Sequence, residues 1–84
     1  YPNPFNGQVV IPFKALNDRE NSISIFNISG LQVYNNSLSA REIESGKIIW
    51  RPNSNMSHSL SSGVYIIKMI SGLDINTSKI MFIK

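Results

Sequence analysis

The sequence predicts an all-β fold, an antiparallel β-sandwich of about seven strands. Short apolar segments are separated by turn residues at short intervals, several of them alternate with a period of two, and none has the 3.6-residue period of a helix. The chain has 84 residues, which suits one small domain with a modest core. We therefore expect residues 1–84 to form a single domain.

The most apolar stretch, residues 61–70, predicts the central strand. It is rich in β-branched and aromatic residues, and Ser and Gly bound it at both ends. Large apolar side chains occupy both alternating sets of positions, with Val64, Ile66 and Ile70 on one face and Tyr65, Ile67 and Met69 on the other. We therefore expect both faces of this strand to be covered. Ser71-Gly72 supplies a turn, and the apolar return over residues 74–83 predicts a hairpin.

The N-terminal third predicts an edge strand and a second hairpin. Residues 9–13 alternate, and Pro12 cannot donate to a ladder, which favours an edge position. Residues 22–27 alternate cleanly, so we expect Ile23 and Ile25 to point inward and the serines to face solvent. Residues 31–34 follow a short Ser-Gly turn, with Leu31 and Val33 on one face, and would pair with residues 22–27.

The middle of the chain is polar and weakly patterned. Residues 35–45 predict a loop with at most a short strand. Gly46 begins a strand over residues 47–50, and Pro52 ends it before an Asn/Ser-rich loop. We expect Leu60, after that loop, to insert into the core.

The charge pattern is typical of a solvated surface. Eight Lys and Arg against five Asp and Glu give a net charge of +3, but the basic residues are scattered singly, whereas a nucleic-acid site needs a contiguous basic stripe. No apolar run approaches the roughly 20 residues of a membrane span. We expect neither a nucleic-acid partner nor membrane insertion. Because the chain begins with Tyr1 and not with Met, we also expect it to be a piece of a longer protein.

The sequence offers little for catalysis or metal binding. It has no cysteine, which excludes disulfides and thiolate ligands. The single histidine, His58, lacks the partners of a zinc shell, and a catalytic triad would have to combine it with Asp18 or Asp74 without a Gly-x-Ser-x-Gly motif. Glu42 and Glu44 lie in a polar segment. We expect no enzyme activity, no metal and no cofactor.

Aromatic residues admit two interpretations. Exposed on a sheet, they could form a platform for a sugar. In a domain of this size each is needed to fill the core, because an aromatic side chain buries roughly 150 to 250 Å². Packing is therefore favoured for Tyr1, Phe5, Tyr34, Trp50 and Tyr65.

Several motifs together resemble a known family. They are the opening Tyr-Pro-Asn-Pro-Phe-Asn, Ile25-Phe26-Asn27-Ile28-Ser29-Gly30, Ser61-Ser62-Gly63-Val64-Tyr65, and Ser78-Lys79-Ile80-Met81-Phe82-Ile83-Lys84. Their order resembles the C-terminal sorting domain, type A, of type IX secretion substrates. The pattern is also similar to the immunoglobulin-like module of flagellar hook-capping proteins. The resemblance implies an immunoglobulin-like sandwich.

The resemblance also implies a function. In that family the domain ends the polypeptide and directs a folded cargo across the outer membrane of Bacteroidetes-like bacteria, and a sortase-type surface peptidase usually then removes it. The implied partners are the type IX translocon and that peptidase. The implied location is the periplasm in transit, followed by secretion or attachment to the outer-membrane surface.

Site residues are carried over by position. The resemblance assigns the sorting motif to Gly63, Tyr65, Gly72, Lys79, Ile80, Ile83 and Lys84, and the domain start to Pro2, Asn3, Pro4 and Phe5. Gly7 stands where relatives often have a second proline, and Arg51-Pro52-Asn53 stands where many have Asp-Gly, so the loop geometry there is expected to differ.

Two other classes of function stay open from the residues alone. One is a structural module of an extracellular or hook-cap assembly, and the other is a carbohydrate-binding accessory domain of a secreted hydrolase. For a sorting signal, the last strand, from Thr77 to Lys84, is suited to β-augmentation by a receptor. The alternative is that this strand simply closes the sheet.

Overall fold

The computed structural model describes residues 7–14, 20–52 and 60–83. This part contains six strands and one short helix: β1 (Val9–Pro12), β2 (Asn21–Asn27), β3 (Gln32–Ser37), α1 (Ala40–Ser45), β4 (Lys47–Trp50), β5 (Gly63–Ser71) and β6 (Asp74–Phe82). The predicted all-β sandwich is confirmed, with six strands in the described part where about seven were expected.

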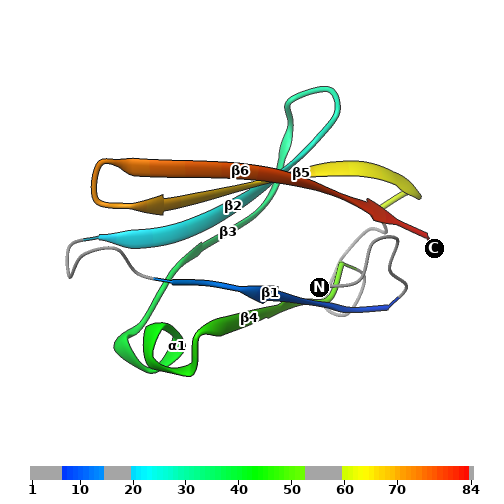
Figure 1. The fold of residues 1–84 in the computed structure, drawn as a ribbon. Helices are drawn as coiled ribbons and strands as arrows, with labels where there is room; N and C mark the ends of the chain where they lie inside the picture. The colour runs from blue at the N-terminus through cyan, green and yellow to red at the C-terminus, as the bar shows by residue number, and fades with distance from the viewer. Residues whose placement is uncertain (1–6, 15–19, 53–59, 84) are drawn as a thin grey trace.

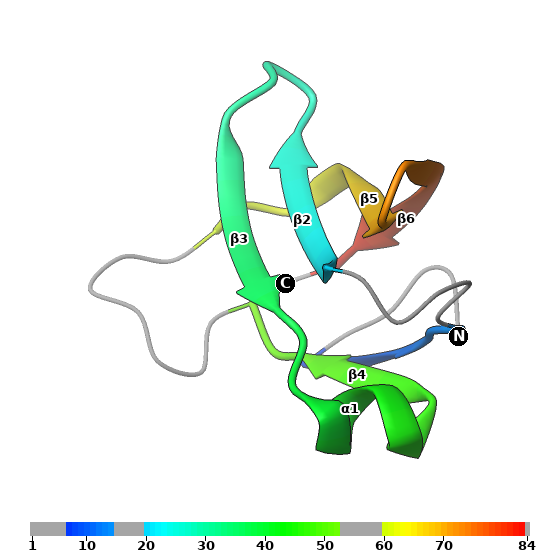
Figure 2. The same cartoon turned by 90° about the vertical axis from the view of Figure 1, so that its left-hand side faces the viewer.

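The strands form two antiparallel sheets. The larger has the order β3-β2-β5-β6, and β1 pairs with β4 in the smaller. Figure 1 shows the four-stranded sheet above and the β1-β4 ribbon below, and Figure 2 shows the same two layers after a quarter turn. The predicted central strand is confirmed, because β5 lies between β2 and β6. Both predicted hairpins are also present, as β2-β3 and β5-β6.

The core fills the space between the two sheets. It is built from apolar side chains that both layers contribute, namely Val9, Ile11, Phe13, Ile23, Ile25, Ile48, Trp50, Leu60, Tyr65, Ile67, Ile80 and Phe82. Trp50 and Tyr65 meet edge to face with ring centroids 5.7 Å apart, and Tyr65 and Phe82 do so at 6.3 Å. Packing is thereby confirmed for Tyr34, Trp50 and Tyr65, and the insertion of Leu60 is confirmed as well. Tyr1 and Phe5 lie outside the described residues.

The expectation that both faces of β5 are covered is wrong. Tyr65 and Ile67 are buried under the β1-β4 ribbon, whereas Val64, Ile66 and Ile70 on the other face are only half-buried. The physical reason is that a two-layer sandwich covers one face of each sheet, and the neighbours β2 and β6 shield the outer side chains only from the sides.

Two local expectations around β2 and β3, for Ser24 and for Leu31, are also corrected. Ser24 is buried although it lies on the outer face, because the Asn35 side-chain nitrogen crosses from β3 to donate to its hydroxyl at 2.8 Å. The strand β3 continues to Ser37, which agrees with the short strand that the expectation for residues 35–45 allowed. Leu31 is exposed and precedes β3, because the pairing shifts by a β-bulge between Ile25 and Phe26.

The segment predicted as a loop ends in a short helix. Ser39 and Glu42 form a capping box, in which the Glu42 N–H donates to the Ser39 hydroxyl at 3.2 Å and the Ser39 N–H donates to the Glu42 carboxylate at 3.0 Å. Gly46, expected to begin a strand, instead ends the helix in a left-handed conformation with φ 75°. These end signals, and not apolar periodicity, define α1.

We expect Glu42→Ala to lower the free energy of unfolding by about 1 kcal/mol at neutral pH, the usual scale of a capping interaction. Hydrogen bonds from the Ser39 N–H, first, and from Asn36 hold the pKa of Glu42 below its ordinary 4.5. Since this folded-state pKa is lowered, the stabilisation is present above the unfolded value and is lost as the pH falls through the folded one. Urea titrations across this range measure it, with exposed Glu44→Ala as the matched control. Equal losses for both variants would contradict the capping role.

Candidate recognition site

Gly72 makes the hairpin between β5 and β6 possible. A two-residue turn, Gly72-Leu73, joins the paired Ser71 and Asp74, and Gly72 has φ 62°. A positive φ at the first central position is what a type II′ turn requires of glycine. The Gly72 N–H also donates to the Glu20 carbonyl at 2.8 Å, so the turn is held to the segment that leads into β2.

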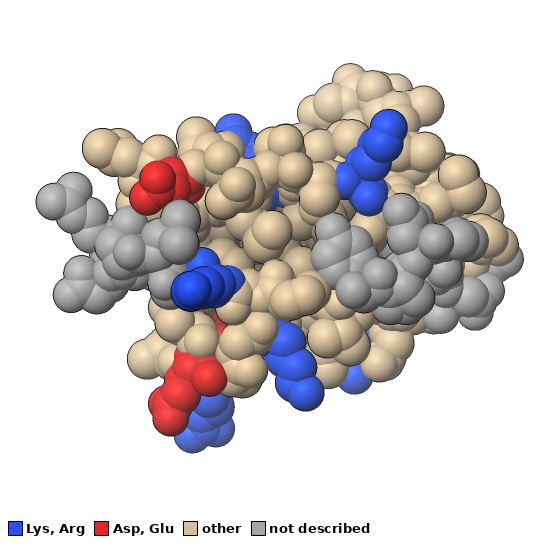
Figure 3. All heavy atoms as spheres, in the orientation of Figure 1, with Lys and Arg blue, Asp and Glu red and all other residues tan. Residues whose placement is uncertain are grey.

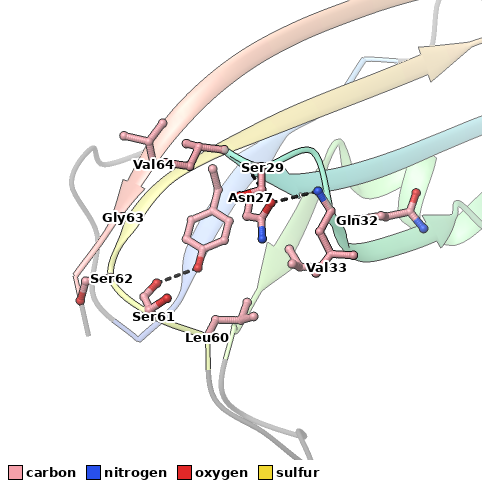
Figure 4. Close-up of a pocket in the computed structure, with 12 residues that line it drawn as sticks. Asn27, Ser29, Gln32, Val33, Leu60, Ser61, Ser62, Gly63 and Val64 are labelled. Carbon is pink, nitrogen blue, oxygen red and sulfur yellow. Dashed lines mark hydrogen bonds between the residues drawn. The ribbon is translucent and has the colours of Figure 1, made fainter.

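Gly63 and Tyr65 lie at the opposite end of β5. Gly63 has φ 153°, a backbone conformation that strains other residues, although no atom lies within 4 Å of an added Cβ. Tyr65 is 4% exposed, and its hydroxyl donates to the Ser61 carbonyl at 2.6 Å, drawn as a dashed line in Figure 4. The ring therefore belongs to the core, while the hydroxyl fixes the chain entering β5.

A hollow of about 560 Å³ lies beside this entry segment, between residues 60–65 and the turn from β2 to β3. Figure 4 shows Asn27 in its wall, with its side-chain oxygen accepting from the Ser29 and Leu31 N–H groups at 3.0 and 2.9 Å. Among the described residues the lining contains no Asp, Glu, His, Lys or Arg.

The motif residues on β6 divide between the two faces of the sheet. Ile80 is 1% exposed and packs in the core. Lys79 and Ile83 are exposed, because side chains alternate along an extended chain. Lys84 and the predicted domain start, from Pro2 to Phe5, lie outside the described residues. The structure thus does not gather the predicted motif into one cluster; Gly63 and Gly72 stand at opposite ends of a nine-residue strand.

The strand β6 is an outer strand of its sheet. In a two-residue hairpin the residue pair that closes the turn is hydrogen bonded, and the following pairs alternate between non-hydrogen-bonded and hydrogen-bonded. In a non-hydrogen-bonded pair the backbone N–H and C=O groups point away from the partner strand. The backbone groups of Ile75, Thr77 and Lys79 therefore point away from β5, toward the edge of the sheet. This is the geometry that β-augmentation uses.

The surface drawn in Figure 3 carries its Lys and Arg side chains apart from one another, with Asp and Glu side chains among them. Within the described ranges no three His, Cys, Asp or Glu side chains gather where they could hold a metal ion. In the same ranges no helix has the length and apolar character needed to cross a membrane.

Together these features define a class: a small β-sandwich in which β6 is an outer strand of the four-stranded sheet, with a surface hollow whose described lining contains no Asp, Glu, His, Lys or Arg. The family model described as the secretion system C-terminal sorting domain matches residues 1–84. The chain belongs to this family, and the resemblance drawn from the motifs is confirmed. No curated protein and no solved structure matches the chain closely enough to count as a relative.

Family membership establishes the function at a coarse level. The chain is a sorting signal of type IX secretion, which implies contact with the secretion machinery and export across the outer membrane to the cell surface or beyond. A sorting domain of this kind is not a catalytic one. The comparisons support neither the structural-module nor the carbohydrate-binding alternative.

Proposed function

We propose that residues 1–84 act as one non-catalytic unit that takes a cargo protein through the periplasm and across the outer membrane. A sortase-type peptidase at the cell surface then acts on the exported chain. Family membership supports this proposal, and the buried core built from both sheets is consistent with a signal that is recognised in folded form.

The observation that carries the mechanism is the position of β6 at the edge of the four-stranded sheet. A receptor strand adds to this edge through the backbone groups of Ile75, Thr77 and Lys79, and reads side chains that point outward. In this mechanism Lys79, Ile83 and Lys84 are contact residues. The other described motif residues contribute to recognition through the shape of the hairpin. Gly63 and Gly72 have positive φ angles, and Tyr65 and Ile80 are core residues.

Fused behind a fluorescent protein that is exported to the periplasm, the domain should send the reporter to the surface or medium of a bacterium with type IX machinery. The reporter without the domain should stay in the periplasm. Fractionation of cells and medium measures the outcome. Deleting residues 79–84 should also retain the reporter, but it removes core residues such as Ile80 and Phe82, so this deletion does not separate misfolding from lost recognition.

The cleaner variant is Lys79→Ser with Lys84→Ser, which should change stability by about 0.5 kcal/mol or less because it leaves the core residues of β6 in place. We expect export to fall while the domain stays folded. The exposed lysines Lys14 and Lys47, replaced by serine in the same way, are the matched control. Normal export of a folded Lys79→Ser, Lys84→Ser fusion would mean that the receptor does not recognise these two lysines.

A further inference from the structure

The outer face of the four-stranded sheet, which the β1-β4 ribbon does not cover, is assembled from three strands. The strand register places Ile66 between Phe26 and Lys79, Lys68 between Ser24 and Thr77, and Ile70 between Ser22 and Ile75. Val64 lies beside Met81 in the next row. We call these four rows the outer face. Only Lys79 among them belongs to the sorting motif that the sequence assigned.

The outer face is largely apolar. Ile75 is 57% exposed and Met81 44% exposed, and four further apolar side chains are half-buried, namely Phe26, Val64, Ile66 and Ile70. Clustered exposed apolar side chains on a small protein mark an interaction surface more often than isolated ones do. Three strands at ordinary spacing and four rows at ordinary rise give a sheet plane of roughly 14 by 27 Å, or about 400 Å². Such an area fits a transient complex better than a permanent one.

The charges of the outer face have one sign. Lys68 and Lys79 are the charged residues of its four rows, and no carboxylate belongs to those rows. Lys68 lies between Ser24 and Thr77 in its row, with Ile66 and Ile70 before and after it on the same face, and Lys79 lies beside Ile66. Their aliphatic stems extend the apolar surface and their ammonium groups define its polar contacts. A second copy of the chain stacked on this face would bring four ammonium groups into one interface, and juxtaposed like charges are unfavourable. The complementary occupant is a protein surface with an apolar centre flanked by Asp and Glu.

We infer that the outer face is a docking surface for an acidic protein partner in the export machinery. The inference rests on the proposed function and deepens it. The partner contacts Ile66, Ile75 and Met81 with apolar side chains and pairs its carboxylates with Lys68 and Lys79. Recognition then extends from the last strand onto β5, to residues that the sorting motif does not include.

Charge reversal tests the electrostatic half of the inference. In the reporter fusion, Lys68→Glu with Lys79→Glu should reduce export about tenfold, because acidic groups would then face an acidic partner. The matched control, Lys14→Glu with Lys47→Glu, makes the same change of charge at exposed lysines that lie outside the four rows. It should export like the unaltered fusion. Circular dichroism and urea unfolding of the purified variants establish that both are folded.

A second pair of variants tests the apolar half. Ile75→Thr keeps a β-branched residue in the strand but removes apolar surface, and should reduce export several-fold. Ile49→Thr makes the same change at an exposed isoleucine of β4, in the other sheet, and should have no effect. Equal export by the folded Ile75→Thr and Ile49→Thr fusions would overturn the inference.

The remaining outcomes separate this inference from the proposed function. If the unaltered fusion is not exported, the proposed sorting function itself fails. If it is exported and the folded Lys68→Glu, Lys79→Glu fusion is exported equally, the docking inference fails together with the proposed contact at Lys79, while the sorting function stands. Sedimentation with vesicles of phosphatidylcholine and phosphatidylglycerol should leave the purified domain in solution. Binding to them that charge reversal abolishes would overturn the inference in favour of an anionic membrane. A dimer that Ile75→Thr dissociates would overturn it in favour of a second copy.

Discussion

Replacing Tyr65 by alanine is expected to lower the free energy of unfolding by about 3 to 5 kcal/mol, enough to unfold much of a small domain. The ring is buried against Trp50 on one side and Phe82 on the other, so truncation leaves a cavity where the two sheets meet. Urea denaturation followed by tryptophan fluorescence measures the loss.

The matched control for this prediction is Tyr65→Phe. It keeps the ring and removes only the hydroxyl that donates to the Ser61 carbonyl, so the expected loss is about 1 kcal/mol. A loss of less than about 1 kcal/mol for Tyr65→Ala itself would show that the side chain does not hold the core together.

The second large effect is expected at Ile80, which the sorting motif includes but the fold buries. Ile80 pairs with Tyr65 across the hairpin and is 1% exposed. Ile80→Ala should cost about 2 to 5 kcal/mol, whereas Ile80→Val, which removes one methylene, should cost about 0.5 to 1.5 kcal/mol. The same urea titrations measure both.

Export then shows whether Ile80 acts through folding or through contact. If it acts through folding, the reporter fusions should lose export in proportion to the unfolded fraction, and Ile80→Val should be exported almost normally. The opposite result would be an Ile80→Ala domain that stays folded yet is not exported, which would mean that the receptor contacts Ile80 directly.

Strands and their pairing were predictable because period-two patterns and turn residues are local signals. The run from Val64 to Ile70, bounded by Gly63 and Gly72, identified both the central strand and its hairpin. The helix was missed because it is only six residues long, too short for apolar periodicity. Its capping box, Ser39 with Glu42, was nonetheless present as a local signal.

The faces of the sheet were harder to predict than the strands. Apolar residues on both sides of β5 suggested two covers, yet a sequence does not say how many layers a fold has. The motif residues came from resemblance. Alternation along β6 places Lys79 and Ile80 on opposite faces, and the burial of Ile80 shows which of these faces points inward. The register between β5 and β6 also places Lys68 and Ile75, which belong to no motif, on the outer face together with Lys79.

The central claim is that this chain is sufficient to address a cargo to the type IX pathway. The most direct measurement is the fraction of reporter found outside the cells in two matched hosts, one with a working type IX translocon and one in which it is deleted. The account predicts that most of the fusion reaches the surface or medium in the first host and that the fusion stays in the periplasm in the second. Equal distribution in the two hosts would contradict it.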